Sequence, residues 1–355
     1  MTLQAYLDKL TPITVTDKLF FVQYLSMMLK AGMSLAPALA SIIAQTKNRH
    51  FQSILSDIRD AIEHGTSFAR ALESHERHFG ALFVNMVRIG ELSGTLEHVL
   101  SELYTQMKKE HEMRGKVRGA LVYPTIVIIA MITIGAGVMI FIVPKMTAMF
   151  NEFKATLPLP TRILMKTSAF MIDHGFLMAL ATILVIGGFI FAIRRPRGKQ
   201  IWHTILLHMP IIGPIVIKIN IARLTRTLGT LLSTAVPIAD ALTITGTVVT
   251  NIHYKQLLAT CADSVKRGSA LGTIFPEMPK LIPPTLAQMV MVGEQTGSLD
   301  TMLKEIAIFY ENEVEQIMST LPSLIEPLLM LILGVGVGSL AVAIIMPMYS
   351  LAQQI

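Results

Sequence analysis

Apolar residues recur every three or four positions along most of the first 118 residues. One stripe contains Phe21, Leu25, Met28 and Leu29, and a similar spacing resumes beyond Gly32. This spacing places side chains on one face of an α-helix, whereas a strand needs strict alternation, which persists nowhere in the chain. The pattern therefore predicts an all-α protein whose first 118 residues form a bundle of amphipathic helices.

Local signals predict where the first of these helices begins and ends. Thr14 and Asp17 have the spacing of a capping box, in which each side chain accepts a backbone hydrogen bond at the helix start. Gly32 is expected to separate the first two helices, and Gly65 to stop a later one.

A ten-residue stretch that begins at Val87 occurs a second time from Val290, at an offset of 203 residues (293 minus 90). The equivalent residues are Gly90 and Gly293, Glu91 and Glu294, and Gly94 and Gly297. The same register continues without gaps from about Leu25 to Pro144. An internal repeat in the sequence indicates that the fold contains the same structural unit more than once. We interpret them as the duplication of one helical unit.

Three long uncharged or nearly uncharged segments are typical of transmembrane helices. They span residues 119–143, 175–193 and 322–347, and each is near the length of about 20 residues that crosses a bilayer. Hydrophobic residues make up 52% of the chain and charged residues 15%. Soluble proteins carry about a quarter charged residues, so this composition favours a membrane protein.

Basic residues flank the first two spans and predict their orientation. Lys116 and Arg118 precede the first span, and Arg194, Arg195 and Arg197 follow the second. Positive residues stay on the cytoplasmic side. Both bundles should therefore face the cytoplasm, together with the N-terminus, which lacks the apolar core of a signal peptide. Three spans would place the C-terminus in the periplasm.

The predicted organisation follows the chain in order. It comprises a first cytoplasmic bundle (1–118), a first span (119–143), a short periplasmic loop (144–174), a second span (175–193), a second cytoplasmic bundle that repeats the first (194–321), a third span (322–347), ended by Pro347, and a periplasmic tail (348–355). Residues 201–219 are apolar but contain Pro210, Gly213 and Pro214, so we expect a buried connector there and no fourth span.

The duplicated turn has several possible roles. Gly90 permits close helix contact, and Gly94 supplies the left-handed conformation that ends a helix. Glu91 lies near a helix C-terminus, where the helix dipole disfavours an acid. Its carboxylate, like that of Glu294, could accept amide hydrogen bonds from the next helix, contact a partner or second subunit, or help to bind a cation.

Two further positions carry candidate functional residues at the entrances of spans. Tyr123 and Pro124 precede the first span, and Glu326 and Pro327 occupy the equivalent positions before the third. An ionisable residue that enters a membrane is a functional candidate. Glu326 could instead be paired, or extend its carboxylate toward the bilayer surface. A Gly334-xxx-Gly338 pair could pack within the chain or in self-association.

Catalytic, metal and cofactor sites are not expected. The chain lacks the GxxxxGK[ST] motif of ATP-hydrolysing proteins and the HExxH motif of zinc enzymes. The single cysteine, Cys261, lies among alanines and is expected to be a small buried side chain. No basic run is interleaved with aromatics, so a nucleic-acid partner is not expected either.

Several of these motifs together resemble the inner-membrane platform proteins of type IV pilus and type II secretion systems, the PilC/GspF family. The motifs are the twin GE-x-[ST]-G-x-L turns, Tyr123-Pro124, Glu326-Pro327, Met209-Pro-Ile-Ile-Gly-Pro214 and Arg226-Thr-Leu-Gly-Thr-Leu-Leu-Ser233. The resemblance covers nearly the whole chain. Many members have an extra stretch before the first bundle, so this chain resembles a short, type IVb-like pilus member.

The resemblance implies a multi-pass protein of a bacterial inner membrane that is not an enzyme. It implies that a cytoplasmic hexameric ATPase engages the bundles, and that the protein moves pilin or pseudopilin subunits into or out of a fibre. Other inner-membrane assembly proteins and a second copy of the chain, in a homodimer, are the remaining implied partners. A passive membrane scaffold is the alternative, followed by a small transporter, which the scarcity of polar residues in the spans disfavours.

Overall fold

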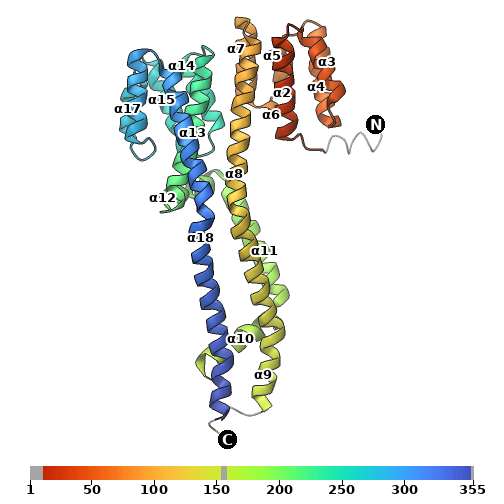
Figure 1. Cartoon of the computed structure of the whole chain (residues 1–355), viewed down its shortest axis with the longest axis vertical. Coiled ribbons are helices and arrows are strands. Elements are labelled where there is room, and N and C mark those ends of the chain that lie inside the picture. The colour runs from red at the N-terminus through yellow and green to blue at the C-terminus, as the bar shows by residue number, and fades with distance from the viewer. Residues whose placement is uncertain (1–10, 153–157, 353–355) are drawn as a thin grey trace. The chain divides into compact units, whose positions relative to one another are not determined.

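A computed structural model describes residues 11–152 and 158–352, and these residues form helices and connecting turns without any strand (Figure 1). The all-α fold with two duplicated bundles and three long apolar helices is therefore confirmed. Residues 1–10 and 353–355, which include the expected cytoplasmic N-terminus and the end of the expected tail, lie outside the described residues.

The first repeat is a bundle of short helices followed by one long helix. Its elements are α2 (Val15–Lys30), α3 (Leu35–Gln45), α4 (Arg49–Glu63), α5 (Phe68–Glu73), α6 (Glu76–Phe79), α7 (Ala81–Ser93) and the first turns of α8 (Leu96–Gly137). The capping box that begins α2 is present: Thr14 Oγ1 accepts from Asp17 N at 3.1 Å, and Asp17 Oδ2 accepts from Thr14 N at 2.9 Å. Gly32 and Gly65 adopt the left-handed φ expected at helix stops.

The second repeat reproduces this order of elements. It contains α13 (Ile212–Ser233), α14 (Ile238–Val248), α15 (Ile252–Lys266), α16 (Leu271–Ile274), the 3₁₀ turn η2 (Phe275–Glu277), α17 (Pro284–Thr296) and the first turns of α18 (Leu299–Ala352). The bounds of α14, α15 and α17 lie 203 residues after those of α3, α4 and α7 (238 minus 35). The duplication in sequence is thus a duplication of helices.

Each bundle buries the apolar stripe that its sequence predicts. In the first repeat Phe21, Leu25, Leu39 and Leu55 are inaccessible to solvent, and full burial of such a side chain contributes about 1.5–3 kcal/mol. In the second repeat Cys261 is fully buried, as expected. Burial raises the pKa of its thiol to about 11, so this residue acts as a small core side chain.

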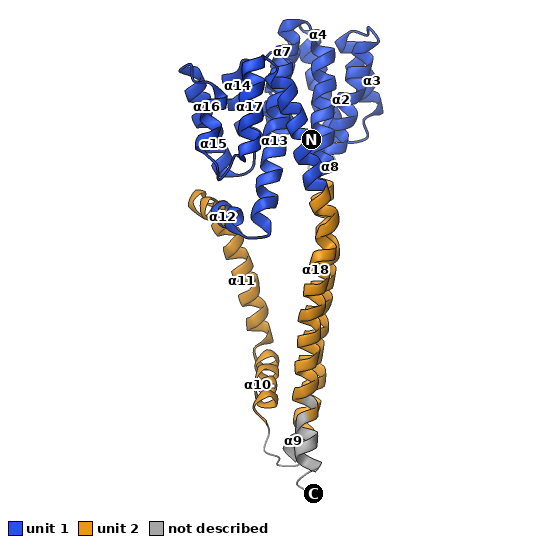
Figure 2. Ribbon diagram, turned by 60° about the vertical axis from the view of Figure 1, so that its left-hand side comes forward, with its two compact units in different colours: residues 1–114, 203–315 blue, residues 115–202, 316–355 orange. Residues whose placement is uncertain are grey.

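The chain divides into two compact units, and each is described by itself (Figure 2). Unit 1 holds residues 1–114 and 203–315, which are the two bundles, and unit 2 holds residues 115–202 and 316–355. The boundaries predicted at 118 and 321 fall inside α8 and α18. Each bundle therefore shares one helix with the span that follows it.

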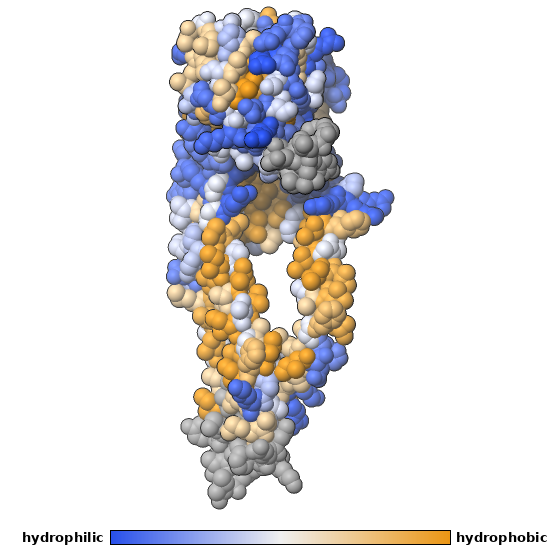
Figure 3. Space-filling model, turned by 90° about the vertical axis from the view of Figure 1, so that its right-hand side faces the viewer, coloured by the Kyte–Doolittle hydropathy of each residue, from blue (hydrophilic) through white to orange (hydrophobic). Residues whose placement is uncertain are grey.

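The three candidate spans belong to long helices with exposed apolar side chains. The first continues from α8 through a π-helical segment η1 (Val138–Ile142) into α9 (Val143–Glu152), the second is α11 (Gly175–Arg194), and the third lies in α18. Figure 3 shows hydrophobic side chains gathered over these segments, whereas the bundles are mostly hydrophilic in that view. Exposed apolar helices of this length suit a lipid environment.

The expected periplasmic loop is largely helical. Part of it belongs to α9, and α10 (Leu159–Asp173) follows. A helix within this loop was not predicted; Pro158 and Pro160 occupy the cap and first turn of α10, where no backbone donor is needed. Pro347 does not end the last helix either, since α18 continues to Ala352; membrane helices tolerate an internal proline when neighbouring groups satisfy the freed carbonyl.

The segment after the second candidate span forms a bent helix pair. Helix α12 (Pro196–His208) meets α13 at an angle of 107°. By length and composition the pair could form a fourth span, but residues 220–225 of α13 are buried in the second bundle. The expectation of a buried connector was wrong: of residues 201–219 only Gly213 is buried, and the others are exposed or half-buried.

Candidate functional site

The duplicated turn adopts the same backbone geometry in both repeats. Helix α7 ends at Gly94 with φ of 71°, and α17 ends at Gly297 with φ of 68°. Thr95 N donates to Gly90 O at 2.8 Å, and Ser298 N donates to Gly293 O at 2.9 Å. These bonds, which span six residues, form a Schellman motif that satisfies carbonyls at the helix end.

The two glutamates of the turn each bind the start of a short helix. Glu91 accepts from the amides of Phe68 and Ala69 at 2.7 and 2.9 Å, one bond to each carboxylate oxygen. Both amides lie in the first turn of α5, where a negative charge also interacts favourably with the positive end of the helix dipole. The amides thus come from a helix that precedes the turn, whereas the prediction from the sequence concerned the helix that follows it.

The second repeat contains an equivalent arrangement. Glu294 accepts from Leu271 N at 2.9 Å and from Gly272 N at 2.8 Å, at the first turn of α16. Charge-assisted hydrogen bonds are about twice as strong as neutral ones. Each carboxylate therefore holds the first turn of one short helix against the duplicated turn of its own repeat.

The first glycine of each turn lies against the helix that follows. A Cβ placed on Gly90 would lie 2.9 Å from Val99 Cγ2, and one placed on Gly293 would lie 3.0 Å from Met302 Cγ. Real Cβ atoms essentially never lie as close to another heavy atom as the 2.9 Å at Gly90. The turn therefore requires glycine to let α7 and α8, or α17 and α18, approach each other.

The candidates at the span entrances lie within continuous helices. Tyr123 is exposed and Pro124 is buried inside α8, while Glu326 is half-buried and Pro327 exposed in α18. The small-residue face of the last span is open: a Cβ added at Gly334 or at Gly338 would meet no heavy atom of the described residues within 4 Å. A functional role for these positions stays a prediction.

Polar residues that were not predicted as functional join the two repeats within unit 1. Arg223 of α13 donates through Nη2 and Nε to Glu110 of α8 at 2.7 and 3.0 Å, and its side chain is 7% exposed. Gln106 Nε2 donates to Thr227 Oγ1 at 3.0 Å, and both residues are buried. An arginine between Ala222 and Leu224 in an apolar helix was the available signal, because a buried charge needs a partner.

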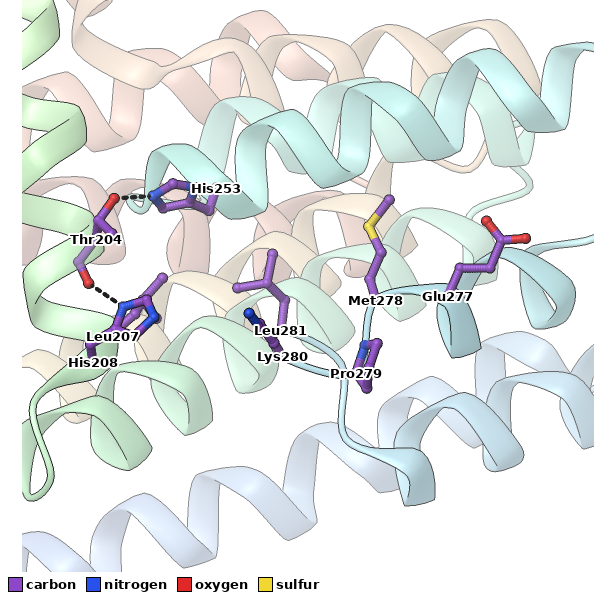
Figure 4. A pocket seen from close by; sticks show the side chains of 9 residues that line it. All are labelled: Thr204, Leu207, His208, His253, Glu277, Met278, Pro279, Lys280 and Leu281. Atoms are coloured by element: carbon purple, nitrogen blue, oxygen red, sulfur yellow. Dashed lines mark hydrogen bonds between the residues drawn. The ribbon is translucent and has the colours of Figure 1, made fainter.

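A pocket of about 730 Å³ lies in the second bundle, beside α12 and η2 (Figure 4). Thr204 and His253 face each other across one end, with Thr204 Oγ1 and His253 Nε2 2.8 Å apart. Met278 and Leu281 line the other part. Among the residues that the structure describes, no group of three or more His, Cys, Asp or Glu side chains is placed to hold a metal ion.

Comparison with known proteins places these features in a family. The family model described as type II secretion system (T2SS), protein F, matches the chain twice, over residues 21–144 and 224–347. The two matched segments start 203 residues apart (224 minus 21), which is the offset of the duplicated turn and of the helices.

Curated relatives match nearly the whole chain. The type IV pilus assembly protein PilC of Myxococcus xanthus (strain DK1622) is 34% identical over 95% of this chain and 80% of its own length. PilC of Pseudomonas aeruginosa is 33% identical over 94% of this chain and 90% of its own length. The type II secretion system protein F of Aeromonas hydrophila is 29% identical over 95% of this chain and 87% of its own length.

The duplicated turn, the repeated bundles, the three apolar helices and these matches lead to one assignment. The predicted resemblance is confirmed, and the three spans together with the family indicate an inner-membrane location. The chain belongs to the type II secretion system protein F family, as a platform protein of pilus or secretion machinery.

Proposed function

We propose that this chain couples a cytoplasmic hexameric ATPase to the insertion or removal of pilin subunits at the inner membrane. Relatives that carry out type IV pilus assembly or belong to type II secretion systems support the kind of machine. The coupling itself, the ATPase and the pilin or pseudopilin subunits are parts of the proposal.

The observation that carries the proposal is that each bundle and the next span share a single helix. Helix α18 includes bundle residues from Leu299 onward and continues through the last candidate span. Helix α8 does the same in the first repeat. A continuous helix transmits displacement along its axis, because each backbone hydrogen bond resists stretching and bending. An ATPase that pushes a bundle would thereby move the adjoining span.

The orientation in this proposal follows from the basic residues that flank the spans. Lys116 and Arg118 precede the first span and Arg194 and Arg195 follow the second, so the positive-inside rule places both bundles in the cytoplasm. The second span returns the chain to that side before the second repeat begins. The N-terminus is then cytoplasmic and the C-terminus periplasmic.

A flexible insertion tests whether the shared helix transmits movement. Seven residues rich in glycine and serine are inserted between Glu315 and Gln316, where unit 1 ends in α18. The matched control inserts seven alanine-rich helical residues, about two turns, which keeps the faces of the helix nearly in register. Membrane insertion, co-purification of the ATPase and fibre assembly are measured for both variants.

We expect both variants to insert and to retain the ATPase, because neither bundle is altered. Fibre assembly should be lost with the flexible insertion and retained to a greater extent with the helical one. Equal assembly by the flexible variant and the unaltered chain would contradict coupling through α18 and would favour a passive scaffold.

A further inference from the structure

The two bundles meet through faces that are not equivalent. The first repeat contributes α8, with Gln106 and Glu110, and the second repeat contributes α13, with Thr227 and Arg223. The counterpart of α8 in the second repeat is α18, and the counterpart of α13 in the first repeat is α2. The contact is therefore head to tail. The equivalent faces, on α2 of the first repeat and on α18 of the second, take no part in it.

The unused face in the first repeat is an apolar stripe on α2. Phe20, Tyr24 and Met27, called here the α2 face, are the counterparts of Arg223, Thr227 and Thr230. Thr227, at the internal junction, is 0% exposed and Thr230 is 2% exposed, whereas Tyr24 and Met27 are 37% and 59% exposed. The rings of Phe20 and Tyr24 lie against each other with centroids 4.2 Å apart.

The unused face in the second repeat lies on the bundle part of α18. Ile308 and Phe309, called here the α18 face, are 43% and 57% exposed. Phe309 is the counterpart of Gln106, which is 5% exposed at the internal junction. The usual distribution is thus reversed: the covered positions are polar and the exposed positions are aromatic or aliphatic.

We propose that the α18 face of one copy of this chain packs on the α2 face of a second copy. The internal junction already brings the equivalent helices, α8 and α13, into contact, with Gln106 hydrogen-bonded to Thr227. Between copies the equivalent contact would join Phe309 to Tyr24. Where the internal junction has two hydrogen-bonding side chains, the equivalent exposed positions both carry aromatic rings, so the two exposed faces are chemically matched.

The membrane limits how such contacts propagate. All copies must have the same side in the cytoplasm, so a symmetry axis has to be perpendicular to the bilayer. A head-to-tail contact repeated about such an axis closes into a ring, in which every α2 face meets an α18 face. Two copies suffice for the smallest ring. The inference rests on the duplicated fold and is independent of the proposed coupling to an ATPase.

Cross-linking in native membranes tests which faces meet. Tyr24→Cys and Phe309→Cys are made in separate, differently tagged full-length chains that are expressed together, and the membranes are oxidised. The chain's own Cys261 is buried and does not compete. We expect a disulfide-linked pair that contains both tags, and none when either variant is expressed alone, because each face meets only the other. Gln106→Cys with Thr227→Cys in one chain serves as the positive control, with an intrachain bond.

A charge exchange checks the same contact without cysteines. Tyr24→Lys or Phe309→Glu alone should lower the fraction of associated copies about tenfold, and the two together should restore it. Both residues are exposed, so the thermal midpoint of each variant should stay unchanged. A cross-link formed by one variant alone, a cross-link to another protein in place of a second copy, or no restoration by the paired charges would each overturn the proposal.

Discussion

The two repeats share the geometry of their turns but not the chemistry of their outer faces. Glu91 and Glu294 fasten α5 and α16 through bonds of 2.7–2.9 Å. By contrast, Gln106 is buried while its counterpart Phe309 is exposed. Equivalent residues that serve their own bundle therefore have the same role in both repeats, whereas equivalent residues on the outer faces differ in polarity and burial. Equivalent substitutions in the two repeats test this difference.

The largest effect is expected from Glu91→Lys or Glu294→Lys. Each removes two charge-assisted hydrogen bonds and leaves two helix amides without that acceptor, at a cost of about 3 kcal/mol or more. Circular dichroism of the purified protein should show a lower thermal midpoint, by a similar amount in the two repeats. Glu305→Lys, at an exposed position of α18, is the control and should have little effect.

The same variants separate a structural role from a partner contact. If the carboxylates serve mainly a partner, the midpoint would stay unchanged while fibre assembly and ATPase co-purification are lost. A loss of stability in only one repeat would contradict the equivalence of the two turns.

A smaller and unequal effect is expected from Gly90→Ala and Gly293→Ala. The new Cβ meets the branched side chain of Val99 in the first repeat, and the flexible side chain of Met302 in the second. A β-branched side chain has few rotamers to move into, whereas methionine adapts. We expect losses of about 2 and about 1 kcal/mol respectively. Equal losses in thermal unfolding would contradict this difference and would show that the backbone contact dominates, because Leu96 Cα and Leu299 Cα each lie 3.1 Å from the new Cβ.

The junction between repeats should depend on its buried ion pair more than on its exposed one. Arg223→Met leaves Glu110 with only Arg114, whose side chain is mostly exposed, as its partner, and we expect a loss of about 2 kcal/mol, of which Glu110→Gln recovers part. Lys304→Met breaks a pair in which the side chains are 31% and 24% exposed, for a loss of about 0.5 kcal/mol. Chemical unfolding measures the loss in the free energy of unfolding for each variant. Equal losses for Arg223→Met and Lys304→Met would contradict a junction centred on Arg223.

The smallest effect is expected where the two turns differ in sequence. Leu92 is 84% exposed, and its counterpart is Gln295. Leu92→Gln should change stability by less than about 0.5 kcal/mol, because the side chain makes few contacts. A clear loss of fibre assembly at unchanged thermal midpoint would instead identify Leu92 as a partner contact of the first repeat.

Features set by neighbouring residues were predictable from the sequence. The left-handed φ of Gly94, the capping box at Thr14 and the apolar stripe of α2 each depend on a few adjacent positions. The spans were predictable from length and hydropathy alone. The duplication was visible because identical residues recur at one offset.

Features that join distant segments were not predictable. The amides that Glu91 binds lie 23 and 22 residues before it, and Arg223 lies 113 residues from Glu110. Neither separation leaves a periodic trace in the sequence. The helix α10 was missed because Pro158 and Pro160 signal a loop as readily as a first helical turn.

The side of the membrane on which the two turns lie tests the account most directly. Ser93→Cys and Thr296→Cys place a thiol at equivalent exposed positions of the two turns, and Cys261 stays unreactive because it is buried and its thiol pKa is raised to about 11. Each variant is treated with a membrane-impermeant maleimide in spheroplasts and in inverted inner-membrane vesicles. The account predicts that both cysteines are labelled in inverted vesicles and neither in spheroplasts; labelling of either turn from the periplasmic side would contradict it.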